Sequence, residues 1–376
     1  MNNVTQNFYV GHASDADWQT LTASCLAQIG RLPDGANLGF LYVTDTLDAD
    51  FPLIAARLRE KTGVAHWVGT VGFGVMVGGK EYFDTPAVVV MIGALDDDAF
   101  KVMSTIATPG EPLTDDAMEW VSRKNPMLGV VHADPRNAYV GDILNSITDD
   151  TDAFLVGGLT ASRGKQPQIA NELTEGGVSG VFFSGDVSVT SGLSQGCSPV
   201  GSIHEVTKAK DNIIYELDKL PALDVFKEDI GEVLAQNLER VGGYIHAALP
   251  VSGDDRGDYL VRNVVGVDPD NKLVAIGERV SAGDRLMFVR RDAPSAMKDL
   301  QRMLADITMR AAGKPKAALY YSCVARGPNL FGRNSEELMA VQNVLGDDVP
   351  VVGFFANGEI SNNRLYGYTG VLTLIG

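Results

Sequence analysis

One pattern of apolar strands and glycines occurs three times in this chain, and it restricts the folds that the chain can adopt. In each copy an apolar strand ends in polar residues, a helix-like segment follows, and a second strand runs into a glycine before a third strand closes the copy. The first strands are Leu38 to Thr46, Met127 to Arg136 and Ala317 to Gly327. The glycines are Gly69, Gly157 and Gly353, each roughly 30 residues after the start of its copy, which is the length of a βαβ unit. The copies lie too far apart in the sequence for a solenoid, so we expect three similar units around one shared site.

The alternation of strand and helix patterns predicts mixed α/β units in which layered β-sheets are flanked by outer helices. Our preferred arrangement has four layers, in the order helix, sheet, sheet and helix. A long middle region separates the first two copies from the third, so we expect two domains, residues 1–225 and 226–376. Within that region, Lys210-Asp211-Asn212 and Asp268 to Asn271 are typical of turns between strands. A helix with one apolar face is expected from Pro294 to Ala312.

Charge and hydropathy exclude several classes of partner. The formal net charge of −17 would repel phosphate backbones and anionic lipids, so we expect neither nucleic-acid nor membrane binding. The most apolar run, Pro86 to Leu95, is about half of the ~20 residues that a membrane helix needs. The first residues lack the pattern of a signal peptide, and a cytoplasmic location is expected. The three cysteines are too few and too scattered for a disulfide framework, so we expect free thiols.

Standard catalytic motifs give weak signals. Gly192 to Gly196 matches the G-x-S-x-G pattern of a nucleophile elbow, but Pro199 follows too soon for the helix that this motif requires. An enzyme that attacks an amide or ester is still an alternative, and its candidate nucleophiles are Ser194, Cys197 and Cys323. The histidines show no pairing at metal-ligand spacing, so we expect no metal site.

Polar residues gather where the strands of the three copies end. Ligands of sheet proteins usually bind beyond the carboxyl ends of strands, and glycine lets the backbone approach a ligand closely. Arg136 or Arg326 could hold a carboxylate, and Asp45 or Glu359 could hold an amine. The candidate ligand-binding residues are Asp45, His132, Asp134, Arg136, Thr160, Ser162, Arg163, Cys197, Ser322, Cys323, Arg326, Asn357 and Glu359.

Structural roles are open for many of the same residues. Asp45, Asp134 and Asn357 are residue types that are common in turns and helix caps. Arg326 and Glu359 could form a structural ion pair with each other. Cys323 could be a small core residue, and His132 could be a core imidazole whose hydrogen bonds are satisfied.

Several motifs together resemble the FIST domain family. The stretches Ser191 to Gly201, Asp211 to Asp218 and Pro221 to Asp224 are similar to the middle of the FIST N domain. Tyr320 to Gly332 and Pro350 to Ile360 are similar to the FIST C domain. The resemblance covers nearly the whole chain. It implies a sensory protein that binds a small ligand, such as an amino acid or another small metabolite, and signals to a partner output protein in trans.

The same resemblance implies a second possibility. Some stand-alone bacterial members are similar to haem-binding nitric oxide sensors that control a histidine kinase or a cyclic-di-GMP enzyme. We expect no cofactor; in the haem alternative, His132 or His204 would be the iron ligand. The sequence departs from the family where many relatives have a histidine before the closing strand, because it has Leu365-Tyr366-Gly-Tyr368 there. A scaffold whose acidic face binds a basic protein is the remaining alternative.

Overall fold

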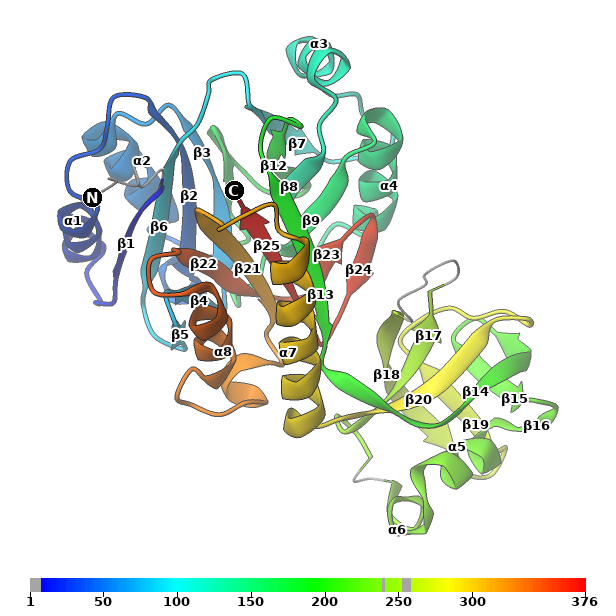
Figure 1. The fold of residues 1–376 in the computed structure, drawn as a ribbon. Coiled ribbons are helices and arrows are strands. Elements are labelled where there is room, and N and C mark those ends of the chain that lie inside the picture. Colours follow the sequence, from blue (N-terminus) through cyan, green and yellow to red (C-terminus); the bar gives the residue numbers. More distant parts are fainter. Residues whose placement is uncertain (1–7, 239–240, 252–257) are drawn as a thin grey trace. The chain divides into compact units, whose positions relative to one another are not determined.

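The computed structural model of the protein describes residues 8–238, 241–251 and 258–376 (Figure 1). These residues form two compact units. One consists of 1–194, 301–365 and 369–376, and the other of 195–300 and 366–368. The three copies of the sequence pattern therefore lie in one unit, and the middle region forms the other. The boundary that we expect between residues 225 and 226 falls inside helix α5, Ala222–Ile230, in the second unit.

The three copies are structural repeats with one order of elements. The first repeat comprises β1 Phe8–Ala13, α1 Trp18–Ile29, β2 Ala36–Thr44, η1 Asp45–Leu47, α2 Phe51–Thr62, β3 His66–Gly72, β4 Gly74–Val77, β5 Lys80–Phe83 and β6 Val88–Ala94. The second comprises β7 Phe100–Ile106, α3 Asp115–Lys124, β8 Leu128–Ala133, α4 Val140–Thr151, β9 Phe154–Leu159, β10 Gln168–Ala170, β11 Glu172–Thr174 and β12 Val178–Phe183. The third comprises β13 Val189–Gln195, α7 Ala293–Arg310, β21 Ala317–Cys323, η3 Gly327–Asn329, α8 Glu336–Leu345, β22 Val351–Ala356, β23 Glu359–Ser361, β24 Arg364–Tyr366 and β25 Thr369–Ile375. The prediction of three recurring units is thus confirmed.

The repeats exchange their hairpins around a ring. Each repeat builds a six-stranded sheet, and the strand orders are β1-β6-β2-β3-β10-β11, β7-β12-β8-β9-β23-β24 and β13-β25-β21-β22-β4-β5. The parallel pair at the centre of each sheet is β2–β3, β8–β9 or β21–β22. The last two strands of each sheet are a hairpin from another repeat: β4–β5 joins the third repeat, β10–β11 the first, and β23–β24 the second. No repeat can complete its own sheet.

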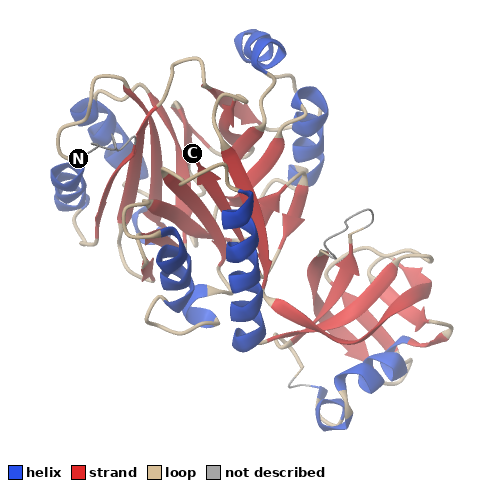
Figure 2. Ribbon diagram, in the orientation of Figure 1, coloured by secondary structure: helices blue, strands red, loops and turns tan. Residues whose placement is uncertain are grey.

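The inner faces of the three sheets share one core. Phe40 of β2, Val130 of β8 and Leu319 of β21 belong to a single cluster of buried side chains. The helices lie on the outer faces of the sheets (Figure 2). A second apolar cluster lies under α1 and α2, and a third lies under α3 and α4. Mixed α/β sheets with outer helices are therefore confirmed, although three sheets surround the core where we expected two stacked ones.

The second compact unit is a barrel of antiparallel strands. Its strands and helices are β14 Cys197–Lys210, β15 Ile213–Leu217, β16 Leu220–Pro221, α5, α6 Glu232–Ala235, β17 Ile245–Pro250, β18 Tyr259–Asp268, β19 Leu273–Ile276 and β20 Arg285–Arg291. The sheet order is β14-β20-β17-β18-β19-β15-β16, and an additional pairing of β14 with β15 closes the barrel. The expected turns at Lys210-Asp211-Asn212 and Asp268 to Asn271 join these strands. Among the described residues, no helix is both long enough and apolar enough to cross a membrane.

The recurring glycines are required by the close packing of the parallel strand pairs. A Cβ atom built on Gly69, Gly157 or Gly353 would lie 1.9, 1.8 or 1.6 Å from the carbonyl oxygen of the facing residue on β2, β8 or β21. Real Cβ atoms do not approach a backbone oxygen so closely, and the backbone here is hydrogen-bonded on both sides. The glycines therefore serve the fold, whereas we had expected them to serve the approach to a ligand.

We expect Gly157→Ala to reduce the free energy of unfolding by about 1–3 kcal/mol or more, because the added methyl group must push β9 away from Val131 of β8. Gly141→Ala is the matched control, since Gly141 lies in α4 with no atom within 4 Å of its Cβ position, and alanine favours the helix. Urea unfolding followed by circular dichroism measures both variants. Equal midpoints for the two would contradict the close-packing argument.

Candidate functional site

Asp45 and Arg163 bring the first and second repeats together at the carboxyl end of β2. Asp45 begins η1, and its Oδ2 atom accepts a hydrogen bond from the Arg163 backbone N–H at 3.2 Å and lies 3.4 Å from the Arg163 guanidinium. Burial raises the pKa of Asp45 despite the positive charge of Arg163. Arg163 is also paired with Asp84, which follows β5. Ser162 donates to Asp48 of the loop after η1 at 3.4 Å. Asp45, Ser162 and Arg163 therefore lie together, as the sequence predicts.

Asp134 and Arg136 form a separate ion pair with each other. The Arg136 Nη2 atom lies 2.6 Å from Asp134 Oδ2 and 3.1 Å from a carboxylate oxygen of Glu175. Burial alone would raise the pKa of Asp134, but the hydrogen bonds from Arg136 and from the Gly176 backbone hold it below its ordinary value. Because Arg136 is already paired with two carboxylates, it is not available in this structure as the carboxylate anchor that we expected.

Thr160 and Asn357 also have structural partners. The Thr160 hydroxyl lies 2.7 Å from the hydroxyl of Thr70, which is equally buried, and the Asn357 backbone N–H donates to Leu159 at 3.1 Å. Asn357 is exposed and joins β22 to β23. These contacts tie the ends of neighbouring repeats together.

Arg326 and Glu337 form a buried ion pair in the first unit. Both side chains are fully buried, and Arg326 Nε lies 2.7 Å from Glu337 Oε1. The expectation of an Arg326–Glu359 pair is thus corrected, because the partner in the ion pair is Glu337 of α8. Tyr320 and Ser322 of β21 donate hydroxyl hydrogen bonds to the Glu337 carboxylate at 2.6 and 3.0 Å. Such a pair is retained only where hydrogen bonds satisfy the remaining atoms, as they do here.

Glu337 was missed by the sequence reasoning, although a signal was present. It lies in the first turn of α8, and the positions that α8 buries include Leu338, Val341 and Leu345. A carboxylate on the buried face of a helix needs a buried cation, and Arg326 ends the preceding strand region. The guanidinium also donates to the Ser194 backbone carbonyl and hydroxyl, at 3.3 Å each.

Glu359 is a second buried carboxyl group near this pair. Its Oε2 atom accepts hydrogen bonds from the Thr369 hydroxyl at 2.7 Å and from the Thr369 backbone N–H at 3.2 Å. Its Oε1 atom has no hydrogen-bond partner among the described residues. Burial raises the pKa of Glu359 to about 8. The side chain is therefore largely protonated at neutral pH and is a poor anchor for an amine.

A pocket of about 390 Å³ lies between the hairpin that contains Glu81 and the segment that follows Arg326 in the chain. It is lined by Glu81, Phe83, Asp84, Pro328, Asn329, Arg333 and Ser335. The lining residues of η3 directly follow Arg326 in the chain, and Gly327 donates its backbone N–H to Glu337 Oε2 at 2.9 Å. Asp84 on the other wall holds Arg163 and thereby the Asp45 cluster. The pocket thus lies between two of the three strand-end regions that the sequence predicts to bind a ligand, those of Asp45 and Arg326.

Glu81 gives this pocket an unusual carboxyl group. Its Oε1 atom accepts the Leu338 backbone N–H at 3.2 Å, and its Oε2 atom is buried without a hydrogen-bond partner among the described residues. Burial and the nearby charge of Glu337 raise the pKa of Glu81 to about 8. A cation in the pocket would favour the ionised form of Glu81.

Models of two related protein domains match most of the chain. The FIST N domain matches residues 37–220, and the FIST C domain matches residues 222–362. The chain belongs to the FIST family. FIST domains are sensory domains for small ligands. An uncharacterized protein of Mycobacterium tuberculosis is 28% identical over 338 residues, which is 85% of this chain and 86% of the relative. An uncharacterized protein of Mycobacterium bovis is 28% identical over 323 residues, or 82% of each chain.

The two histidines of the haem alternative do not fit an axial ligand of this FIST protein. His132 is completely buried in β8, its Nε2 atom lies 3.3 Å from the Tyr42 hydroxyl, and burial lowers its pKa to about 3. The ring centroids of Tyr42, Tyr321 and Phe354 lie 5.6–6.3 Å from the centroid of the imidazole, so aromatic side chains pack against it where a bound haem would need space. His204, in the barrel, is held on both nitrogens, by Asp218 at 2.7 Å and Asp229 at 2.9 Å.

The three candidate nucleophiles of the enzyme alternative are buried. The Ser194 hydroxyl lies beside the Arg326 guanidinium, which cannot accept a proton. Cys197 and Cys323 are buried, at the start of β14 and the end of β21. No group of three or more His, Cys, Asp or Glu side chains that could hold a metal ion occurs among the described residues.

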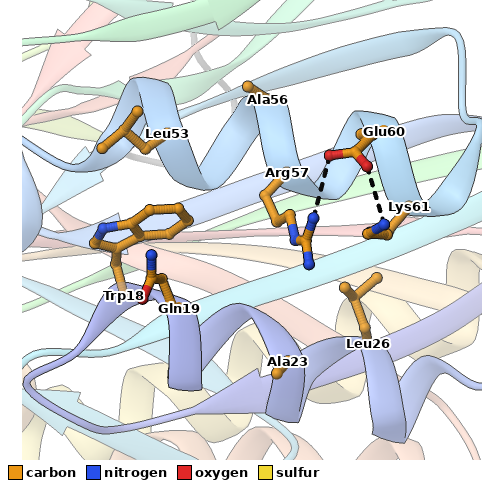
Figure 3. Close-up of a pocket in the computed structure, with 9 residues that line it drawn as sticks. All are labelled: Trp18, Gln19, Ala23, Leu26, Leu53, Ala56, Arg57, Glu60 and Lys61. Carbon is orange, nitrogen blue, oxygen red and sulfur yellow. Dashed lines mark hydrogen bonds and ion pairs between the residues drawn. The ribbon is translucent and has the colours of Figure 1, made fainter.

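A further hollow lies on the outer side of the first repeat, between α1 and α2 (Figure 3). Its walls combine apolar side chains, such as Trp18 and Leu53, with an ion-paired group in which Glu60 lies 3.2 Å from Arg57 and 2.9 Å from Lys61. None of the candidate strand-end residues lines it. We therefore do not place the ligand site of the FIST protein there.

We expect Arg326→Met to reduce the free energy of unfolding by about 3–5 kcal/mol, because it leaves the Glu337 charge buried without its cation. Adding Glu337→Gln should recover part of that loss, since the remaining side chain is neutral. Urea unfolding of the two single variants and the double variant measures the coupling. Lys314→Met breaks the exposed pair with Asp348 and should leave the midpoint almost unchanged. Additive effects at Arg326 and Glu337 would contradict a direct pair.

The raised pKa of Glu359 predicts a pH dependence of stability. Between its ordinary value of 4.5 and about 8, the folded protein holds a proton that the unfolded chain has lost. The free energy of unfolding should therefore fall with rising pH in this window, by up to about 1.4 kcal/mol per pH unit for this group. In Glu359→Gln the free energy of unfolding should fall less steeply with pH. Its stability relative to the natural protein should be highest above pH 8. Parallel stability curves at pH 5.5, 7 and 8.5 would contradict the assignment.

Proposed function

We propose that this FIST protein is a cytoplasmic, non-catalytic sensor that binds a small zwitterionic metabolite, of the amino acid type, in the pocket between the hairpin that contains Glu81 and the segment that follows Arg326. The observation that carries the proposal is the composition of the pocket wall. The pocket has a volume of about 390 Å³, which is within the range of small-molecule sites. Arg333 supplies a cation, and Glu81 and Asp84 supply carboxyl groups on the facing hairpin.

The charges of the wall match the two ends of such a ligand. Arg333 is exposed and forms no ion pair among the described residues, so its guanidinium is available for a carboxylate. The buried Glu81 Oε2 atom lacks a hydrogen-bond donor, which an ammonium group would supply. Asp84 is already paired with Arg163, so Glu81 is the better acceptor.

The position of the pocket supports a sensory role. Glu81 and Asp84 belong to the hairpin that the first repeat donates, whereas Asn329 and Arg333 belong to the third repeat that receives it. A bound ligand would therefore link two repeats. A ligand that prefers one arrangement of such elements shifts the free-energy difference between the two arrangements, typically by about 1–3 kcal/mol. We propose that a partner in trans, such as a histidine kinase or a cyclic-di-GMP enzyme, responds to that shift; the sensory character of the family supports this step.

We expect an amino acid or a small carboxylate to raise the melting temperature, because a ligand at a hundred times its Kd adds about 2.7 kcal/mol of stability. A thermal-shift screen identifies the compound, and calorimetry gives its Kd. Arg333→Ala should weaken binding by about 10-fold or more through loss of the charged hydrogen bond. Arg31→Ala, which removes an exposed arginine outside the pocket, should have no effect.

Proton release gives an independent check of the proposed contact between the ligand ammonium group and Glu81. At pH 7 a ligand ammonium group should drive Glu81 towards its ionised form, so binding should release up to one proton. Calorimetry in buffers of different ionisation enthalpy measures this number. Binding that tolerates Arg333→Ala and releases no proton would place the ligand elsewhere, and a screen without any binder would reject the proposed ligand class.

A further inference from the structure

A second pocket, separate from the proposed sensory site, lies where the first repeat meets the end of α8. Its volume is about 430 Å³. Its lining includes Val10, His12, Ile29, Val77, Gln342 and Asp347. None of these residues lines the proposed sensory pocket. The wall is thus built from β1, the end of α1, β4 and the turn between α8 and β22.

Gln342, which lines this pocket, has a buried hydrogen-bond acceptor that the described residues leave unused. The side chain is only 7% exposed. Its Nε2 atom donates to the backbone carbonyls of Gly346 at 2.7 Å and Val349 at 3.0 Å. Because both partners are carbonyl oxygens, the amide nitrogen must face them, and the orientation of the amide is fixed. The Oε1 atom therefore points elsewhere, and it has no hydrogen-bond partner among the described residues.

The same pocket carries a carboxylate without a cation. Asp348 is paired with Lys314, but Asp347 forms no ion pair among the described residues. His12 lines the opposite side, where its Nδ1 atom lies 2.7 Å from the Tyr82 hydroxyl. Burial and the nearby ammonium group of Lys80 lower the pKa of His12, which favours the neutral form of its ring. The chain as a whole has a net charge of −17, which raises the local concentration of cations.

We propose that this pocket binds a small organic cation with a primary ammonium group on a short alkyl chain. The ammonium group supplies the donors that Gln342 Oε1 and the Asp347 carboxylate lack, and it has no acceptor that would compete. The apolar side chains of Val10, Ile29 and Val77 suit the alkyl portion. The site is independent of the sensory pocket and of the ligand proposed there.

The test compares 1,4-diaminobutane with the neutral isostere 1,4-butanediol on the full-length protein. The diamine should bind and shift the side-chain amide resonance of Gln342 in ¹H–¹⁵N spectra, whereas the diol should do neither. Asp347→Asn should weaken diamine binding by about 10-fold, because it removes one charge-assisted hydrogen bond. Asp150→Asn is the matched control, since it removes an equally exposed carboxylate from α4, far from the lining residues in sequence.

Three outcomes would overturn the proposal: equal binding of diamine and diol, an unchanged Gln342 resonance, or the same Kd for Asp347→Asn and Asp150→Asn. Arg333→Ala separates this site from the sensory pocket, because it should leave the Kd of the diamine unchanged. Loss of diamine binding in Arg333→Ala would assign the diamine to the other pocket and would also reject the proposal. Failure of the amino acid screen has no bearing on this result.

Discussion

The exchange of hairpins between repeats is the constraint on which the first unit of this protein depends. Each central pair of parallel strands has an edge of unpaired backbone groups, at β3, β9 or β22, and such an edge needs a partner. In every repeat the partner is a hairpin that belongs to another repeat. The direction of donation is the same each time, so the three exchanges close a ring. The shared core of the three sheets follows from this closure.

The ring also explains where charge can be buried. Between the donated hairpin β4–β5 and the receiving repeat, Arg326, Glu337 and Glu81 gather in one neighbourhood. The ion pair itself lies within the third repeat, and Glu81 of the donated hairpin approaches it from the first repeat. The raised pKa of Glu81 is therefore a consequence of the assembly of repeats, because burial and the charge of Glu337 in another repeat cause it. A small ligand that enters this neighbourhood meets charges that the fold has already oriented.

Much of the architecture could be predicted from the sequence, because the features that encode it are local. Three strands with polar ends, three helices and three glycines recur at similar spacing, and the structure confirms them as repeats. The collisions that a side chain would cause at Gly69, Gly157 and Gly353 explain why the pattern is visible at all. The similarity to FIST domains is distributed over several such local motifs, and the family was recognisable for the same reason.

Partnerships between distant residues could not be predicted in this way. Both Glu359 and Glu337 are acidic residues that follow Arg326 in the chain, and only the packing of α8 against β21 selects Glu337. Likewise, Arg136 lies two residues from Asp134 and turns back to it, so its role as a ligand anchor could not be judged before the loop was known. Local patterns specify elements, whereas the choice among equivalent charges depends on tertiary structure.

One consequence of the exchanged hairpins concerns synthesis on the ribosome. The chain emerges from its N-terminus, and β4–β5 pairs with β22, which is among the last strands to appear. During most of translation this hairpin therefore has no strand to pair with. The core shared by the three sheets also lacks the third sheet during that time. The nascent chain must keep apolar strands apart from other chains until the last repeat leaves the exit tunnel.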